Sequence, residues 1–186
     1  MAYFQRKSWP PFVYQGTTYD LSHLDEYQLS VRDSADIDRV IAVTFTDHCF
    51  TAKPEAGDDP ELVYPGSSRQ PGHFAFARYQ LSLDLARLIE QATHGKVWNV
   101  KGENVAAVPT VNHAGNQILY AIVFSLDPVK GLPVDLHMRV ESAYPATEKS
   151  LVTFGSVRFH HLVALRMERK RPKQITDQRR KVPKVV

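Results

Sequence analysis

Alternating apolar and polar residues dominate the second half of the chain and decide its fold class. Between Leu132 and Tyr144 every second residue from Val134 onward is apolar or small, which is the periodicity of a strand with one buried face. The other segments with strand character are 39–46, 96–100, 104–111, 117–126 and 155–166. Short turns separate the segments after residue 96, so we expect them to form an antiparallel meander.

A single amphipathic helix is expected before this series of strands. Residues 78–94 carry apolar residues at helical spacing, and Gly95 follows in a position where many helices end. The apolar face consists of Leu81, Leu85, Leu88, Ile89 and Ala92. A helix of this kind buries its apolar face against another element. We therefore predict an α+β fold, with one amphipathic helix packed on an antiparallel meander sheet of four to six strands.

The composition divides the chain into three parts. Residues 1–36 are rich in aromatic residues and lack periodicity, so we expect an irregular segment packed on the body. Residues 37–166 are predicted to form a single α+β domain, in which 52–73 is a long loop rich in Pro and Gly. Residues 167–186 form a basic C-terminal tail. A length of 186 residues suits one domain, and 43% hydrophobic residues exclude a wholly disordered chain.

The sequence predicts a cytoplasmic protein that needs no cofactor. No apolar run follows Arg6 and Lys7, so the N-terminus does not have the pattern of a secretory signal. No segment approaches the roughly 18–20 apolar residues of a membrane span. A single Cys excludes a multi-Cys zinc site, and no phosphate-binding glycine motif is present. We expect neither a metal nor a membrane partner.

The positive charge of the chain is concentrated at its C-terminal end. Residues 166–186 hold nine cations and two anions, a net charge of +7, so the other 165 residues carry −4 of the total of +3. The candidate nucleic-acid-binding residues are Arg166, Arg169, Lys170, Arg171, Lys173, Arg179, Arg180 and Lys181. Such a segment suits a polyanion, because each neutralised phosphate releases counterions. A solvated terminus that only aids solubility is the alternative.

Five polar residues share one face of the last two predicted strands. They are His137, Arg139, Glu141, Arg158 and His160. The expected antiparallel register places Arg139 opposite His160 and Glu141 opposite Arg158. Histidine and glutamate transfer protons near neutral pH, and arginine stabilises charge on a phosphate in the transition state. The set therefore suggests metal-independent cleavage of RNA, with cross-strand ion pairs on a solvated face as the alternative.

The order of elements resembles the RelE-like and barnase–EndoU–colicin group of ribonucleases, in which a helix precedes a four-stranded antiparallel sheet. The segment 139–145, Arg-Val-Glu-Ser-Ala-Tyr-Pro, is similar to their strand with a small hydroxyl residue, an aromatic residue and a proline. The resemblance covers roughly residues 78–170. The groups it implicates in phosphate contact and proton transfer are Arg139, Arg158 and His160. It also implies that Ser142 or Tyr144 positions the substrate, whereas strict alternation places these two opposite Arg139.

A second, smaller candidate follows the first predicted strand. His48 and Cys49, with His73, could bind a metal or form a nucleophilic Cys–His pair. Adjacent residues of an extended segment point in opposite directions, so a buried structural Cys is the preferred interpretation.

These observations lead us to expect an RNA-binding protein, with metal-independent endoribonuclease activity as the sharper hypothesis. A non-catalytic binding or assembly module for a protein or nucleic-acid partner, of mobile-element or phage origin, is the alternative. A homo-oligomer is compatible with either.

Overall fold

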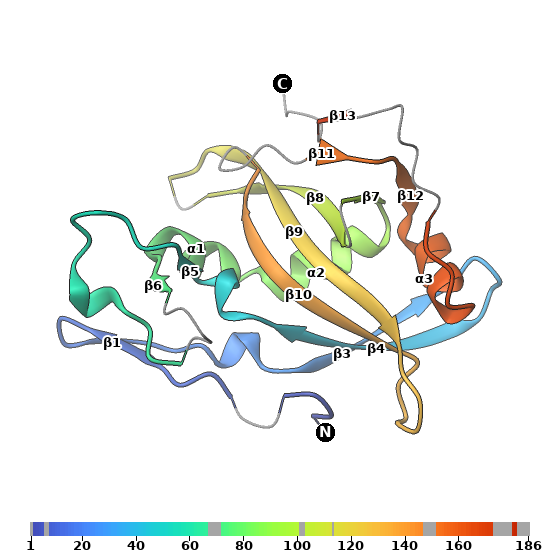
Figure 1. Ribbon diagram of the computed structural model, residues 1–186, viewed down its shortest axis with the longest axis horizontal. Coiled ribbons are helices and arrows are strands. Elements are labelled where there is room, and N and C mark those ends of the chain that lie inside the picture. Colours follow the sequence, from blue (N-terminus) through green and yellow to red (C-terminus); the bar gives the residue numbers. More distant parts are fainter. Residues whose placement is uncertain are drawn as a thin grey trace.

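A curled, mixed sheet of seven strands forms the centre of the molecule (Figure 1). The structure is a computed structural model that describes residues 2–5, 8–66, 72–100, 103–112, 114–146, 152–172 and 180–181. Three α-helices lie in these residues, so the protein is α+β as predicted. Within the same residues, no helix is both long and apolar enough to cross a membrane.

The strands of this sheet follow the order β12-β7-β8-β9-β10-β4-β3. Their bounds are Tyr27–Arg32 for β3, Asp38–Phe45 for β4, Lys96–Asn99 for β7, Asn104–Val111 for β8, Gln117–Pro128 for β9, Leu136–Pro145 for β10 and Ser156–Arg158 for β12. Strands β7 to β10 form the predicted antiparallel meander. Strand β4 pairs with β10 in parallel, so the sheet is mixed and exceeds the predicted four to six strands.

Shorter elements surround the sheet. The helices are α1 (Phe76–Ser82), α2 (Leu85–Thr93) and α3 (Phe159–Met167), and the 3-10 turns are η1 (Ser22–Leu24), η2 (Asp47–Cys49) and η3 (Pro60–Leu62). Three two-stranded pairs are β1 (Phe12–Tyr14) with β2 (Thr17–Tyr19), β5 (Thr51–Ala52) with β6 (His73–Phe74), and β11 (Val152–Thr153) with β13 (Arg180–Lys181). Strand β13 therefore places part of the predicted basic tail beside β11.

The predicted helix over residues 78–94 is two helices. Helix α1 ends at Ser82, whose hydroxyl donates to the carbonyl of Tyr79 at 2.8 Å and lies 2.8 Å from Nε2 of His23. A serine hydroxyl that bonds to the preceding turn competes with helical geometry, which accounts for the break. The predicted apolar face is nevertheless correct. All five of its residues, Leu81, Leu85, Leu88, Ile89 and Ala92, are buried in the main core.

The two faces of the sheet have different environments. One face packs against α2 and α3 in the main core, where Ile122, Phe124 and Val140 are buried. Alternate residues point to the opposite face, which holds a smaller apolar cluster that includes Ala121 and Val123. We call this opposite face the second face. Its apolar cluster is small, so much of its remaining area is available to polar side chains.

The prediction of a strand over residues 155–166 is wrong. Strand β12 covers only Ser156–Arg158 and pairs with β7, and α3 begins at Phe159. The buried residues Phe159, Leu162 and Val163 recur at helical spacing, although the same stretch also alternates. Short apolar segments satisfy both periodicities, and burial against the sheet selects the helix.

The N-terminal part is more regular than expected. Hairpin β1–β2 turns at Gln15 and Gly16, which both have positive φ, as a two-residue type I′ turn requires. Strand β3 pairs with β4 at the edge of the main sheet, so residues 1–36 are not irregular throughout. The alternation of Tyr27, Leu29 and Val31 with polar residues is the signal that was missed.

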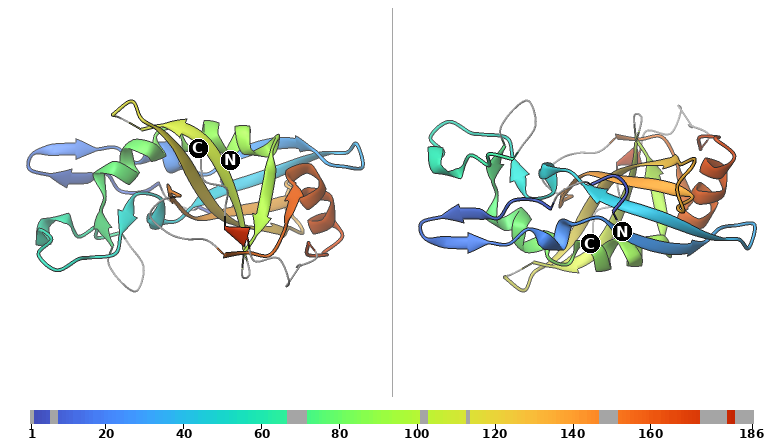
Figure 2. Two further views of the ribbon diagram at one scale, coloured as in Figure 1. Left: turned by 90° about the horizontal axis from the view of Figure 1, so that it is seen from above. Right: turned by 90° about the horizontal axis from the view of Figure 1, so that it is seen from below.

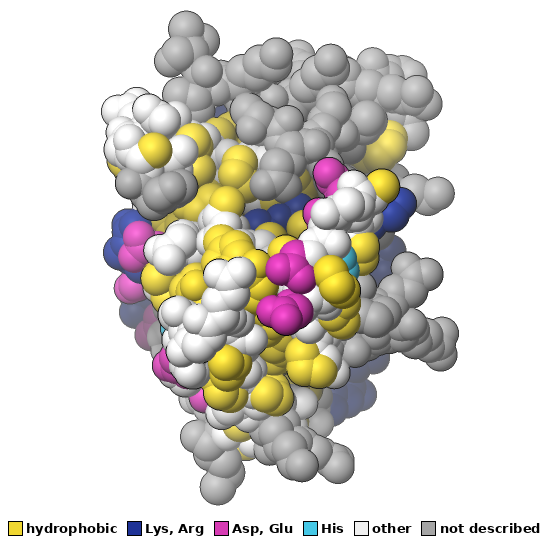
Figure 3. Space-filling model, turned by 90° about the vertical axis from the view of Figure 1, so that its left-hand side faces the viewer, with side chains coloured by type: hydrophobic (Ala, Val, Ile, Leu, Met, Phe, Trp, Pro, Cys, Tyr) yellow, Lys and Arg dark blue, Asp and Glu magenta, His cyan; other side chains and the backbone are white. Residues whose placement is uncertain are grey.

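One end of the molecule presents an apolar surface. Hairpin β1–β2 and residues 51–66 extend beyond the main sheet in the views of Figures 1 and 2. Phe12 and Phe74 stack here with ring centroids 4.3 Å apart. Figure 3 shows apolar side chains around several carboxylates on this end, where Val13 and Val63 are exposed.

Candidate functional site

Polar side chains cross the second face along three neighbouring strands. The register of β9 and β10 places Ser125 opposite Arg139 and Asp127 opposite His137. Arg139 also lies beside Thr44 of β4. Side chains opposite one another on adjacent strands are about 4.5–5.5 Å apart at Cβ, so these groups form a continuous surface. We call it the polar strip, made up of Thr44, Ser125, Asp127, His137, Arg139 and Glu141.

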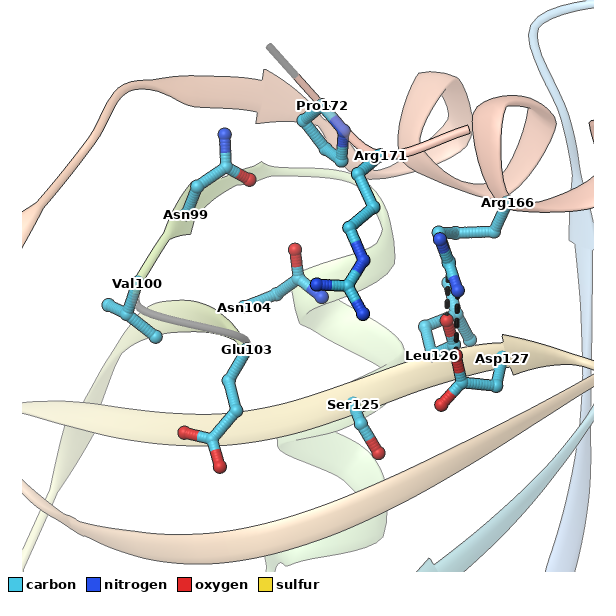
Figure 4. Close-up of a pocket in the computed structure, with 10 residues that line it drawn as sticks. All are labelled: Asn99, Val100, Glu103, Asn104, Ser125, Leu126, Asp127, Arg166, Arg171 and Pro172. Carbon is cyan, nitrogen blue, oxygen red and sulfur yellow. Dashed lines mark hydrogen bonds and ion pairs between the residues drawn. The ribbon is translucent and has the colours of Figure 1, made fainter. Parts of the chain in front are cut away.

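A pocket opens beside the polar strip, between the β7–β8 turn, β9 and the end of α3 (Figure 4). Its lining residues are Asn99, Val100, Glu103, Asn104, Ser125, Leu126, Asp127, Arg166, Arg171 and Pro172. Its volume is about 80 Å³, far below the roughly 300–1,000 Å³ of sites that enclose a whole small molecule. The pocket is therefore large enough for only a single functional group.

Arg166 is an anchor rather than a free cation. Its guanidinium donates to the carbonyl of Leu126 at 2.7 Å, to Asp127 at 2.6 Å and to the carbonyl of Lys170 at 3.1 Å. The side chain is only 11% exposed. These contacts hold the end of α3 over β9, so three donors of this predicted nucleic-acid-binding residue are used within the protein.

Arg171 places a second guanidinium group at the pocket. Its side chain points into the pocket between Asn104 and Arg166 (Figure 4), the residue is exposed, and it forms no ion pair within the described residues. Lys170, in contrast, is bound to Glu168 at 2.7 Å, which raises the pKa of the lysine.

Of the other residues predicted to bind nucleic acid, only some lie among the residues that the structure describes. Arg169 is exposed two residues beyond the end of α3. Arg180 and Lys181 lie in β13, and Lys173 and Arg179 fall outside the described residues.

Glu103, which lines the pocket, lies near enough to Glu141 to feel its charge. Burial raises the pKa of Glu103, and the negative charge of Glu141 raises it further. Glu141 is the additional residue of a β-bulge, where the register with β9 shifts between Val140 and Ser142. Its carboxylate lies 3.6 Å from Nε of Arg139. Two carboxyl groups whose environments differ in this way suit proton transfer.

The bulge also reverses which residues of β10 point to each face of the sheet. Beyond it, Ala143 lies in the main core, whereas Tyr144 joins the apolar cluster of the second face. Ser142 lies opposite Val123, a member of that same cluster. The prediction that Ser142 and Tyr144 face away from Arg139 is therefore wrong, because strict alternation does not anticipate a bulge.

His137 is half-buried at the far end of the polar strip. Its Nε2 lies 2.7 Å from Oγ1 of Thr44, and the ring of Phe4 stacks on the imidazole. Burial lowers the pKa of His137, an effect that Glu26 opposes and Arg139 reinforces. The neutral imidazole is therefore favoured at pH 7.

The structure divides the predicted catalytic set. His137, Arg139 and Glu141 lie together on β10, whereas Arg158 ends β12 opposite Lys96. His160 is exposed in the first turn of α3. Strands β7, β8 and β9 separate β12 from β10, so the expected pairing of Arg139 with His160 and of Glu141 with Arg158 is wrong.

The three residues of the smaller candidate site, His48, Cys49 and His73, lie in different environments. Cys49 is fully buried, and burial raises the pKa of its thiol to about 12. His73 is paired with Asp58 at 2.8 Å, and His48 is exposed. The described residues contain no group of three His, Cys, Asp or Glu side chains placed to hold a metal. The preferred interpretation of Cys49 as a buried residue is confirmed.

Sequence reasoning missed most residues of the pocket. Ser125 and Asp127 alternate with the buried residues Phe124 and Leu126, so they occupy the face of Arg139 once β9 is paired with β10. That pairing of consecutive strands was a usable signal. Arg166 and Arg171 were predicted from the charge of the C-terminal segment, but their position at the pocket had no such signal, because it depends on how α3 packs.

The fold and the pocket define a mixed α+β domain with a polar surface on one face of its sheet. The model of the YjaZ family matches residues 11–167, and the chain belongs to that family. Neither a curated protein nor a solved structure matches the chain.

Proposed function

We propose that the protein binds single-stranded RNA across the second face, with one phosphate group in the pocket. The observation that carries this proposal is the guanidinium of Arg171, which points into the pocket beside Asn104 and Ser125. Guanidinium, amide and hydroxyl groups are the donors that bind phosphate oxygens. The small volume of the pocket suits one such group.

The surroundings of the pocket favour RNA over a free anion. Beyond the pocket, the polar strip offers both donors and acceptors, such as Arg139 and Glu141, which suit the edges of unstacked bases. Arg171 also belongs to the segment 166–186, whose net charge of +7 attracts a polyanion. Sequence-specific RNA recognition usually involves single strands, because their base edges are accessible.

The test is fluorescence anisotropy of a labelled single-stranded RNA at several salt concentrations, with the full chain. We expect the Arg171→Ala variant to bind more weakly. The negative slope of log K against log salt should become shallower by about 0.7, the contribution of one phosphate contact. Arg87→Ala is the matched control, because Arg87 is an exposed arginine of α2 that pairs with Asp84. Equal effects of the two substitutions would contradict the proposal that the pocket binds a phosphate. Absence of binding by the unmodified protein would favour the alternative of a protein-binding module.

RNA cleavage without a metal is a second candidate, favoured by the raised pKa of Glu103 beside Glu141. In this scheme Glu141 accepts the proton of a 2′-hydroxyl as the 2′-oxygen attacks phosphorus. Glu103 then protonates the leaving 5′-oxygen, and Arg139 stabilises the phosphate charge.

Incubation with RNA and EDTA tests the cleavage candidate. We expect cleavage by the unmodified protein and by His160→Ala, since His160 lies away from the polar strip, and none by Glu103→Gln. Intact RNA in all three samples would exclude this second candidate and leave RNA binding untouched.

A further inference from the structure

An N-terminal arm, residues 3–5, covers His137 on the second face. The ring of Phe4 lies parallel to the imidazole, with an interplanar angle of 1° and ring centroids 3.9 Å apart. This is the arrangement that a nucleobase adopts on an aromatic side chain. The arm therefore occupies a place that would suit an unstacked base.

The main chain of the arm is attached through one carboxylate. Both oxygens of Glu26 accept from the backbone N–H groups of Tyr3, Phe4 and Gln5, at 2.6–2.7 Å. Burial alone would raise the pKa of Glu26, but these three donors hold it below its usual value. Phe4 is only half-buried, in contrast to the fully buried Phe50 and Phe124 of the core. The contacts described here place the arm on the surface of the sheet, outside the core.

The imidazole does not depend on the arm for its orientation. Thr44, which is 6% exposed, holds Nε2 of His137 at 2.7 Å from beneath the surface. On the same strand, Arg139 is the next residue to face the same way. Asp127, opposite His137 on β9, is also a lining residue of the pocket. One extended ligand can therefore lie over His137 and in the pocket at once.

We infer that the surface over His137 is a base-stacking subsite of the RNA site, which Phe4 occupies in the free protein in place of a base. This inference rests on the proposed function. RNA must displace the arm to use the subsite, so the apparent affinity equals the intrinsic affinity multiplied by the fraction of molecules in which the subsite is vacant. Removal of the Phe4 ring should then tighten binding, on the order of tenfold for one stacked base.

The test uses a single-stranded RNA that contains one 2-aminopurine, whose fluorescence is quenched when the base stacks. We expect Phe4→Ala to bind about tenfold more tightly than the unmodified protein and to quench the probe more strongly. Tyr3→Ala is the matched control, because it keeps the backbone contacts with Glu26 and the ring of Phe4. Glu26→Gln should act like Phe4→Ala, since it weakens the attachment of the arm, and loss of the Glu26 charge further favours the neutral imidazole that His137 already holds.

His137→Ala supplies the complementary measurement. We expect it to abolish the quenching in the Phe4→Ala background, with circular dichroism as the check on folding. If the unmodified protein binds RNA but Phe4→Ala does not tighten binding, or if quenching persists without His137, the stacking subsite is wrong and the proposed function stands. If neither the unmodified protein nor Phe4→Ala binds RNA, the proposed function fails, and the subsite fails with it.

Discussion

Among single residues, Arg166 illustrates how a basic side chain can serve the fold instead of a ligand. Its three acceptors come from β9 and from the chain after α3, and the side chain is nearly buried. We expect Arg166→Ala to lower the free energy of unfolding by about 1.5–3 kcal/mol, the range for hydrogen bonds to charged groups. Arg166→Lys should recover little of this, because an ammonium lacks the planar fork. Urea denaturation measures both, and a change as small as that of Arg87→Ala, within about 0.5 kcal/mol, would contradict the anchoring role.

Two half-buried histidines give the stability a defined pH dependence. Burial lowers the pKa of His23 and of His137 below the unfolded value of 6.5. Below pH 6.5 the unfolded chain therefore binds more protons than the folded one, and the free energy of unfolding falls as the pH falls. Glu26 and Asp33 have lowered pKa values, so their stabilising contributions are lost only below about pH 4.5.

The prediction is that His23→Gln and His137→Gln together flatten the stability profile between pH 7 and pH 5. Denaturant titrations at each pH measure this profile. His160→Gln, at an exposed position, serves as the control. A double variant that keeps the slope of the unmodified protein would refute the assignment to these two histidines.

At the scale of whole elements, the local sequence pattern correctly predicted some strand bounds and shared faces, which depend on neighbouring residues alone. The bounds of β8 were predicted correctly, and the alternation of β10 placed His137, Arg139 and Glu141 together. Pairing between distant segments was not accessible in this way. Strand β4 lies along one edge of β10 and β9 along the other, so no edge was left for β12. Arg158 and His160 consequently lie elsewhere.

The choice between helix and strand at residues 159–167 has a direct mutational test. In the helix, Leu162 is fully buried and Leu165 is only half-buried, whereas a strand would bury Leu165 and leave Leu162 on the other face. We expect Leu162→Ala to cost about 2–5 kcal/mol, because it leaves a cavity between α3 and the sheet. Leu165→Ala should cost clearly less. The opposite ranking in urea denaturation would favour the strand.

On the scale of the molecule, charge separates into a mildly acidic body and a basic C-terminal segment. The proposed phosphate pocket lies where the two meet, since Arg171 belongs to the segment and Ser125 to the sheet. The segment should therefore attract RNA over a long range, while the pocket fixes its position.

Neutralising the distal cations within the full chain separates these two contributions. The change replaces Lys173, Arg179, Arg180, Lys181 and Lys184 by Gln, which lowers the net charge of the protein from +3 to −2. We expect weaker RNA binding with a shallower dependence on salt, because fewer counterions are released. Arg171→Ala in this background should weaken the remaining binding again, since the pocket acts at short range. If Arg171→Ala has no further effect there, Arg171 does not contribute to RNA binding, and the proposed phosphate pocket is wrong.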